Sequence, residues 1–234
     1  IEPVHSLNKI GLCYQKLYNY EYADSLFIEA IEKYKIVKDT IDSDAVIFYN
    51  NLAESMAEQA EFSYSNILLK TSIAILQRDS TNKDNIKNII RTYHKLIKNH
   101  LRTDSLEQAK IYIEEAFKIE DKVTETVCNT NLYNGIYFYK LSQYREANKV
   151  LTECLDCYKS YLKPTSQSIA ETYLVLAQVK IALAEYDKAR EIINKGLKIT
   201  IKNYRKKSER HANYLKVVAH LDKELGNYQE SEKI

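Results

Sequence analysis

The strongest constraint on how this chain folds is a pattern of residue types that recurs about every 42 residues. A small residue marks the same place in each copy. The six marks are Ala23, Ser65, Ala109, Ala147, Ala189 and Ser231, at spacings of 42, 44, 38, 42 and 42 residues. A period of this length is typical of repeat architectures, in which one short unit of structure stacks on copies of itself.

Positions at fixed distances from each mark also hold side chains of similar size in the successive copies. Three residues before the marks lie Tyr20, Phe62, Leu106, Tyr144, Tyr186 and Tyr228; four residues after lie Phe27, Leu69, Ile113, Leu151 and Ile193. Seven residues after lie the small residues Ala30, Ser72, Ala116, Cys154 and Gly196. Twelve residues before the marks lie Gly11, Ala53, Ile97, Gly135, Ala177 and Ala219. Steps of three, four and seven residues place side chains on one face of a helix.

The copy from Ser168 to Gly196 shows what one unit contains. Two apolar helical patterns are joined by a turn at Ala184 and Glu185, and the small residues Ala177 and Ala189 let the two helices approach closely. A single hairpin of this size cannot bury its apolar faces, so copies must stack on it. The sequence therefore predicts an all-α chain of helix–turn–helix repeats.

The first copy carries a resemblance to a known family. It reads Leu7-x2-Ile10-Gly11-x2-Tyr14, followed by Ala23-x3-Phe27-x2-Ala30, and this resembles the tetratricopeptide repeat (TPR). The repeats are longer than the usual 34 residues or so, and the run Tyr49-Asn50-Asn51-Leu52-Ala53 is similar to the extended repeats of the kinesin light chain type. The resemblance implies a right-handed α-solenoid of about six TPR-like repeats.

We expect one solenoid domain over residues 1–234. Its repeats are predicted at approximately 4–38, 45–77, 86–120, 127–162, 166–201 and 209–234, the last one truncated. Because the chain begins with Ile1 and the sixth repeat stops at Ile234 inside its second helix, we expect a fragment of a longer protein.

Composition and motifs argue against an enzyme. The 4 Gly and 2 Pro leave little room for Gly-rich phosphate loops, and no catalytic or cofactor-binding motif is present. The net charge of +2 implies no general attraction to nucleic acid or membrane. No stretch is long and apolar enough to span a bilayer, and no signal peptide is visible. We expect no cofactor, no metal and no membrane contact, and we favour a cytoplasmic location.

Cys154 and Cys157 form a C-x-x-C motif on a predicted helix, without a second pair or a nearby histidine to complete a tetrahedral zinc site. We expect both to be buried structural thiols, with metal or redox use as the alternative. Cys154 also occupies the small position seven residues after a mark.

A basic stripe distinguishes the first helix of the third copy. Lys87, Arg91, Lys95, Lys98 and Arg102 fall on one helical face, opposite Ile89, Ile90, Tyr93, Leu96 and Ile97. Like charges at this spacing cost an isolated helix about 0.2–0.5 kcal/mol per pair. The stripe therefore needs compensation from a neighbouring helix or from a ligand.

The family resemblance implies that the first helices of the repeats line a concave, peptide-binding groove. Carried over by repeat position, its residues are Asn8, Asn50, Asn51, Glu54, Arg91, His94, Lys95, Lys98, Arg102, Tyr133 and Tyr139. Asparagines there would hold a peptide backbone, and the cations would hold carboxylates or phosphates. The two tyrosines would supply flat, amphipathic contacts.

The stripe has a second interpretation. Glu54 and Glu58 precede it by one repeat, and they can instead pair with Lys95, Lys98 or Arg102 across the repeats. Such exposed pairs contribute about 0–1 kcal/mol.

The expected function is a non-catalytic protein- or peptide-binding scaffold, with acidic or phosphorylated segments as ligands. The alternative is a sensor or recruitment arm of a larger enzyme or transcriptional regulator. Nucleic acid is not the expected partner; RNA binding through the stripe would show steep salt dependence. A second basic run, Lys202 to Arg210, is weaker because Glu209 interrupts it.

Overall fold

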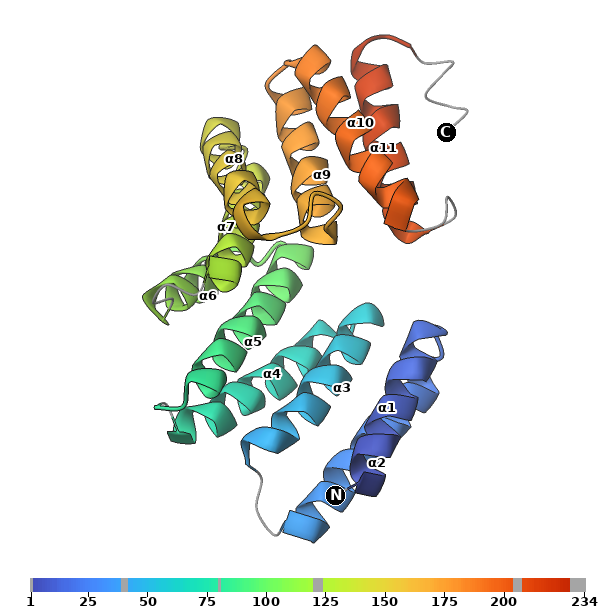
Figure 1. Ribbon diagram of the computed structural model, residues 1–234, viewed down its shortest axis with the longest axis vertical. Helices are drawn as coiled ribbons and strands as arrows, with labels where there is room; N and C mark the ends of the chain where they lie inside the picture. Colours follow the sequence, from blue (N-terminus) through green and yellow to red (C-terminus); the bar gives the residue numbers. More distant parts are fainter. Residues whose placement is uncertain (1, 39–41, 80, 120–123, 204–207, 228–234) are drawn as a thin grey trace. The chain divides into compact units, whose positions relative to one another are not determined.

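Regular structure is entirely helical in the computed structural model, which describes residues 2–38, 42–79, 81–119, 124–203 and 208–227 (Figure 1). The α-helices of this part are α1 (Glu2–Lys16), α2 (Tyr20–Lys38), α3 (Val46–Glu58), α4 (Phe62–Leu76), α5 (Lys83–Arg102), α6 (Leu106–Ile119), α7 (Thr124–Lys140), α8 (Tyr144–Tyr161), α9 (Gln167–Ala182), α10 (Tyr186–Asn203) and α11 (Glu209–Glu224). Short 3-10 helices lie at Ser43–Ala45 and Gln77–Asp79. The predicted all-α fold of helix–turn–helix repeats is confirmed.

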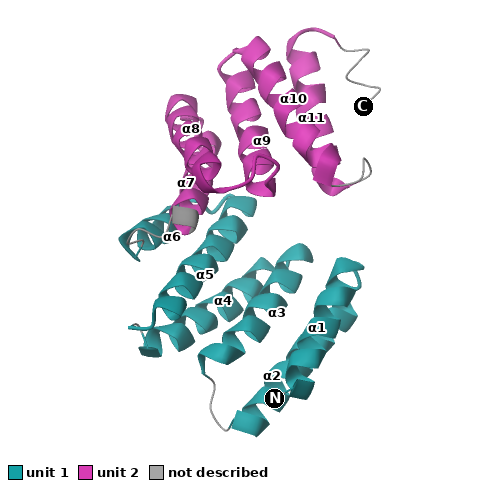
Figure 2. Cartoon of the chain, in the orientation of Figure 1, with its two compact units in different colours: residues 1–121 teal, residues 122–234 magenta. Residues whose placement is uncertain are grey.

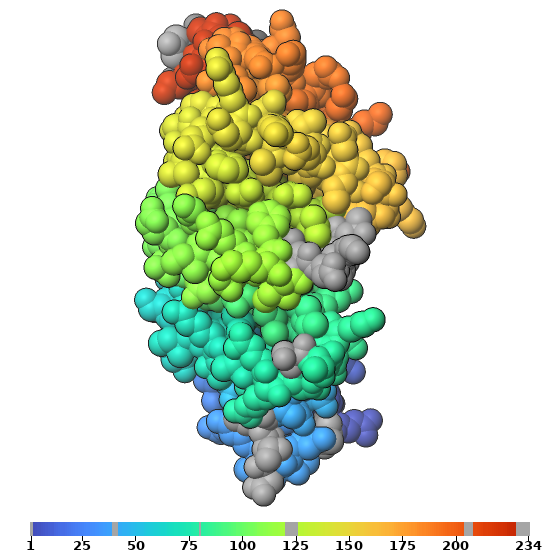
Figure 3. Space-filling view, turned by 90° about the vertical axis from the view of Figure 1, so that its left-hand side faces the viewer, coloured from blue at the N-terminus to red at the C-terminus, as the bar shows by residue number. Residues whose placement is uncertain are grey.

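The helices group into two compact units, residues 1–121 and 122–234 (Figure 2). Unit 1 holds the pairs α1–α2, α3–α4 and α5–α6, and unit 2 holds α7–α8, α9–α10 and the single helix α11. Inside each unit the second helix of a pair packs on the first helix of the next, and the sequence colours accordingly form adjoining bands (Figure 3). The single domain over 1–234 stays a prediction. The second helix of the sixth repeat, from Tyr228 onward, and the basic residues Arg205 to Lys207 lie outside the described residues.

The first helix of every repeat ends in the same way. The residue five positions before each mark has a positive φ, between 52° and 66° in the first five copies and 79° in the sixth; these residues are Tyr18, Ala60, Asp104, Ser142, Ala184 and Gly226. The next residue donates its N–H to the carbonyl five residues earlier, as Glu185 does to Lys180 at 2.9 Å and Asn227 does to Asp222 at 2.8 Å. This is the Schellman ending of a helix, which usually places glycine at the left-handed position.

Close helix contact explains the small position twelve residues before each mark. A Cβ on Gly11 would lie 2.6 Å from Phe27 Cε1, and one on Gly135 would lie 2.5 Å from Leu151 Cγ. The facing residue is in both cases the large one four residues after the mark. The third copy instead holds Ile97 at this position, fully buried.

The cysteines of unit 2 differ from the prediction. Cys157 on α8 is joined to Cys128 on α7 by a disulfide, with Cα atoms 5.9 Å apart, so it is not a free buried thiol. The two bonded cysteines are 29 residues apart in the sequence, so Cys157 is not paired with Cys154 of the C-x-x-C motif. Cys154 is buried and donates its thiol to the Cys128 carbonyl at 3.1 Å, and burial raises the pKa of that thiol to about 12. Within the described part, no cluster of His, Cys, Asp and Glu is arranged as a metal site.

The turn geometry predicts an unusual effect of glycine. In Ala184→Gly, the strain of a left-handed alanine is removed, and we expect the free energy of unfolding to rise by about 0.5–1 kcal/mol. The control is Ala182→Gly at the exposed end of α9, where glycine should lower stability instead. Urea unfolding followed by circular dichroism measures both. Equal losses in the two variants would contradict the strained-turn interpretation.

Candidate functional site

Helix α5 presents two distinct faces, as the sequence predicts. Its start is capped by Asn82, whose side chain accepts hydrogen bonds from the backbone N–H groups of Asp84 and Asn85 at 2.9 and 3.4 Å. The buried apolar residues on one face are Ile89, Ile90, Tyr93, Leu96 and Ile97. Their packing fixes the helix and turns the basic stripe toward the opposite side.

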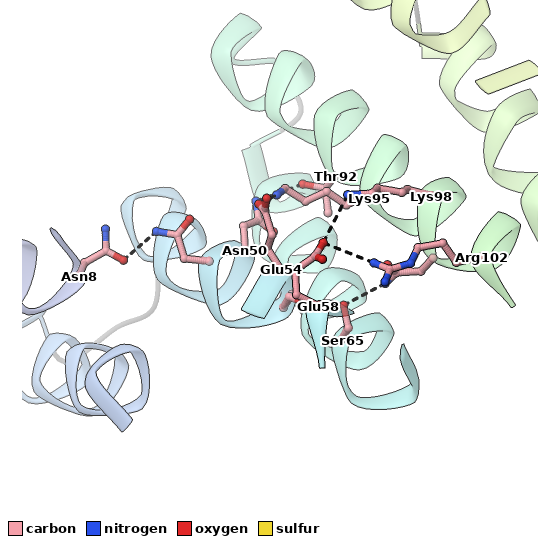
Figure 4. A network of polar contacts seen from close by, with 12 residues as sticks. Asn8, Asn50, Glu54, Glu58, Ser65, Thr92, Lys95, Lys98 and Arg102 are labelled. Atoms are coloured by element: carbon pink, nitrogen blue, oxygen red, sulfur yellow. Dashed lines mark hydrogen bonds and ion pairs between the residues drawn. The ribbon is translucent and has the colours of Figure 1, made fainter. Parts of the chain in front are cut away.

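Asparagines link the first helices of unit 1 to one another (Figure 4). Asn51 on α3 donates to Asn8 on α1 at 2.8 Å, and Asn50 donates to Thr92 on α5 at 3.4 Å. Asn8 is only 4% exposed. These predicted peptide-contacting side chains therefore also hold three neighbouring repeats together.

Ion pairs across the repeats compensate part of the basic stripe (Figure 4). Lys95 pairs with Glu54, while Lys98 and Arg102 lie 3.5 and 3.4 Å from the Glu58 carboxylate. Pairing between repeats, the second interpretation of the stripe, is thus present. Burial raises the pKa of Glu54, but the nearby ammonium groups of Lys95 and Lys98 outweigh it and hold that pKa below its ordinary value.

Arg102 has an additional contact. Its guanidinium lies over the Phe62 ring, 4.9 Å from the ring centre. A cation over an aromatic face gains about 0.5–1 kcal/mol at an exposed site. Phe62 begins α4, so this contact also ties α5 to the preceding repeat.

The stripe keeps an excess of positive charge after this pairing. Lys95, Lys98 and Arg102 share the carboxylates of Glu54 and Glu58, whereas Lys87 and Arg91 make no ion pair with any residue that the structure describes. Arg91 is the more exposed of these two cations, so its guanidinium is open to a partner without the loss of an existing ion pair.

The His94 side chain is buried, unlike the neighbouring cations of the stripe. It is 6% exposed, which leaves little surface for a ligand. Burial, together with the charge of Arg91, lowers its pKa to about 4. Three positions after Arg91, it lies at the border of the stripe beside the buried face of Ile90 and Ile97.

The predicted tyrosines belong to the other unit. Tyr133 and Tyr139 lie on α7 of unit 2 and are half-buried, whereas all other predicted site residues lie in unit 1. The Tyr139 ring lies 5.8 Å from the Tyr144 ring, and burial raises the pKa of its hydroxyl. Membership of all eleven residues in one peptide groove stays a prediction.

Sequence reasoning missed a polar cluster beside the stripe. Asn99 is buried on α5 and donates at 2.9 Å to both Ser65 Oγ and Asn66 Oδ1 on α4. Ser65 also donates to the Ala53 carbonyl at 2.7 Å. In the sequence, this cluster is indicated only by the second mark, which is serine rather than alanine.

The two kinds of contact predict unequal losses of stability. Asn51→Ala leaves the buried Asn8 amide without this partner and should cost about 1–3 kcal/mol. Glu58→Gln removes two exposed ion pairs and should cost less than about 1 kcal/mol. Urea unfolding curves of both variants measure the difference, and a larger loss in Glu58→Gln would contradict the ranking.

His94 predicts how stability depends on pH. The unfolded histidine binds a proton below pH 6.5, whereas the folded one does so only near its pKa of about 4. The unfolded state therefore binds more protons between these values, and stability should fall as the pH drops from 6.5 to 4. In His94→Gln this loss should be smaller, as measured by thermal unfolding across that range. Identical pH profiles would show that His94 does not titrate as described.

Comparison with known proteins identifies the repeat. The tetratricopeptide repeat family model matches residues 125–202. No curated protein matches the chain in sequence.

Solved structures share the fold over most of the chain. BtubC (BKLC) from P. vanneervenii has a TM-score of 0.71 at 16% identity, covering 93% of this chain and 87% of that one. TPR-like repeats of a kinesin light chain from Podosopora anserina give 0.63 at 17% identity, covering 87% and 97%. A Rap protein complexed with Competence and Sporulation Factor gives 0.72 at 14% identity, covering 97% and 62%.

The matched segment lies inside unit 2, and unit 1 repeats the same helix pairs with the same turns. Among the described helices, none is long and apolar enough to cross a membrane. Residues 125–202 therefore match the tetratricopeptide repeat, and most of the chain shares the fold of solved tetratricopeptide-like arrays.

Proposed function

We propose that this chain is a non-catalytic scaffold that binds a segment of another protein on the first-helix surface of unit 1, formed by α1, α3 and α5. Its preferred ligands are acidic or phosphorylated segments. The observation that carries this proposal is the charge excess of the α5 stripe, in which three of the five cations share two carboxylates and the other two make no ion pair with a described residue.

The weakness of the existing ion pairs supports this role. Side chains of Lys95, Lys98 and Arg102 are 33–50% exposed, so each pair contributes about 0–1 kcal/mol. A ligand carboxylate or phosphate can share or replace such partners at little cost. Arginine adds the option of two parallel hydrogen bonds to one anionic group.

The buried amide contacts support the proposal in a different way. Helix α3 is joined to α1 by the contact of Asn51 with Asn8, and to α5 by the contact of Asn50 with Thr92. The backbone that carries the cations is therefore held in place before a ligand arrives. Binding to a surface that is already ordered costs less conformational entropy.

Similarity to the Rap protein agrees with a binding role, since that protein is seen complexed with Competence and Sporulation Factor. The same comparison favours the alternative function. This chain spans 62% of that Rap chain, which fits a sensor or recruitment arm attached to an effector domain. The reading frame on both sides of the chain distinguishes a free scaffold from such an arm.

Arg91→Glu tests the acidic preference without breaking an ion pair of the network. The full chain is applied to immobilised heptapeptides that carry glutamate, phosphoserine, serine or lysine at their central positions. We expect wild type to favour the glutamate and phosphoserine peptides, and Arg91→Glu to weaken this binding about five- to tenfold.

The matched control is Lys35→Glu, an equal charge change at an exposed site on α2, the second helix of its pair. It should bind like wild type, and circular dichroism should show that both variants keep their helices. The proposal is wrong if wild type binds the glutamate and phosphoserine peptides no better than the serine and lysine peptides.

A further inference from the structure

The second helices of unit 1 carry exposed apolar side chains at repeated positions. These positions lie one residue before each mark, and two and five residues after it, a spacing that follows one face of a helix. They hold Tyr22, Ser25 and Ile28 on α2, Tyr64, Ile67 and Lys70 on α4, and Gln108, Ile111 and Glu114 on α6. All nine residues are exposed, and the five tyrosines and isoleucines among them are 40–59% exposed.

The same positions in unit 2 show how a solvated face of this fold is built. They are also exposed, but they hold Glu146, Lys149 and Thr152 on α8, and Lys188, Glu191 and Asn194 on α10. The helix pairs are of the same kind in both units, so the fold itself does not require apolar residues at these positions. Apolar side chains gathered on an exposed face mark a site of contact with another molecule.

Helix α4 is the central second helix of unit 1 and carries the least charge. Among its 15 residues, Phe62–Leu76, only Lys70 is charged, and Lys70 makes no ion pair with any residue that the structure describes. One side of α4 packs on α3 and α5, and the other side exposes Tyr64, Ile67 and Ala74. A helix that is largely apolar on both sides is usually covered on both sides.

The outer side chains of α4 form three rows along the helix. Residues seven positions apart are separated by nearly two turns and therefore lie one above the other. The rows are Ser63 with Lys70, Ile67 with Ala74, and Tyr64 with Thr71. The Ile67 row lies in the middle, and Ala60, in the turn before α4, continues it.

These rows are complementary to themselves. When two copies of α4 run antiparallel about a two-fold axis at Ile67, positions equally far from Ile67 lie at the same height, and each row faces its own equivalent. Tyr64 then meets Thr71 of the second copy, and Ala74 meets Ala60, where two small residues let the helices approach closely.

Charge also fits this arrangement. Lys70 meets the Ser63 hydroxyl of the second copy, which can accept a hydrogen bond from the ammonium group. The two Lys70 residues lie on opposite sides of the axis, six helical positions or about 9 Å apart along the helices. The face therefore brings its apolar centre together without opposing its single charge to a like charge.

We infer that this chain forms an antiparallel homodimer through the outer face of α4, with Ile67 on the two-fold axis. The second copy is the occupant because the face matches itself in size, polarity and charge. The inference goes beyond the proposed function, since it uses the second helices, whereas the proposed ligand binds the first helices α1, α3 and α5.

The size of the face sets the strength of this dimer. The outer face of α4 measures about 22 Å by 10 Å, which is less than the roughly 600 Å² per partner of small specific interfaces. Ile28 on α2 and Ile111 on α6, the helices of the neighbouring repeats, extend the apolar contact. We expect a dissociation constant in the micromolar range, on the order of 10 μM.

The test is sedimentation velocity of the full chain at concentrations from about 1 to 200 μM, where we expect a change from monomer to dimer. Ile67→Glu places two carboxylates on the axis and should weaken the dimer at least about tenfold. The matched control is Ile36→Glu, the same substitution on α2 at a side chain that is 81% exposed and lies outside the three rows. It should leave the dissociation constant unchanged.

Ser63→Glu tests the antiparallel arrangement by strengthening the dimer. The new carboxylate lies beside Lys70 of the second copy, whereas Lys70 of its own chain is about 10 Å away along the helix, too far for an ion pair. Two such pairs per dimer should tighten association about threefold to tenfold, and Ser63→Lys should weaken it by a similar factor. Circular dichroism checks that each variant keeps its helices.

Each outcome bears on the inference separately from the proposed function. A chain that stays monomeric over the whole range refutes the dimer, and so does a dimer that Ile67→Glu fails to weaken. A dimer that Ser63→Glu does not tighten refutes the antiparallel pairing. Binding of the glutamate and phosphoserine heptapeptides should be the same for Ile67→Glu as for wild type, because the first helices are unchanged.

Discussion

The fold depends on a turn that reverses the chain after each first helix. Such a turn needs one residue with a positive φ, and five of the six copies use a residue other than glycine there, among them Tyr18 and Asp104. The backbone strain is tolerated because the same turn satisfies the helix-terminal carbonyls and brings two apolar helix faces into contact. Once this register is set, the large residue of the second helix meets the small residue of the first, as Leu151 meets Gly135.

Polar contacts between repeats divide into two kinds with different consequences. Buried amides such as Asn8 and Asn99 have little water around them, so their hydrogen bonds are costly to lose and position the helices. Exposed pairs such as Lys98 with Glu58 contribute little and can exchange partners. A binding surface benefits from this combination, because the backbone stays ordered while the charged side chains remain available.

The two units present different surfaces to a ligand. In unit 1, positive charge is spread along α5 and partly matched by Glu54 and Glu58. In unit 2, hollows lined by α9 and α11 lie beside the exposed Lys216.

Periodicity in the sequence by itself determined the all-α repeat fold and the two faces of α5, and it offered pairing of the stripe with Glu54 and Glu58 as one of two interpretations, because these follow from helical spacing within a repeat and from equal positions in neighbouring repeats. The contacts of Asn8 with Asn51 and of Asn50 with Thr92 were seen only in the tertiary structure. The tertiary structure decided what depends on exact approach: His94 is buried although it borders the stripe, and Cys157 bonds to Cys128 rather than remaining a thiol. It also decided that α9 and α11 leave hollows between them, since a cavity depends on how side chains from separate helices fill the space, and a repeat pattern records only their size class.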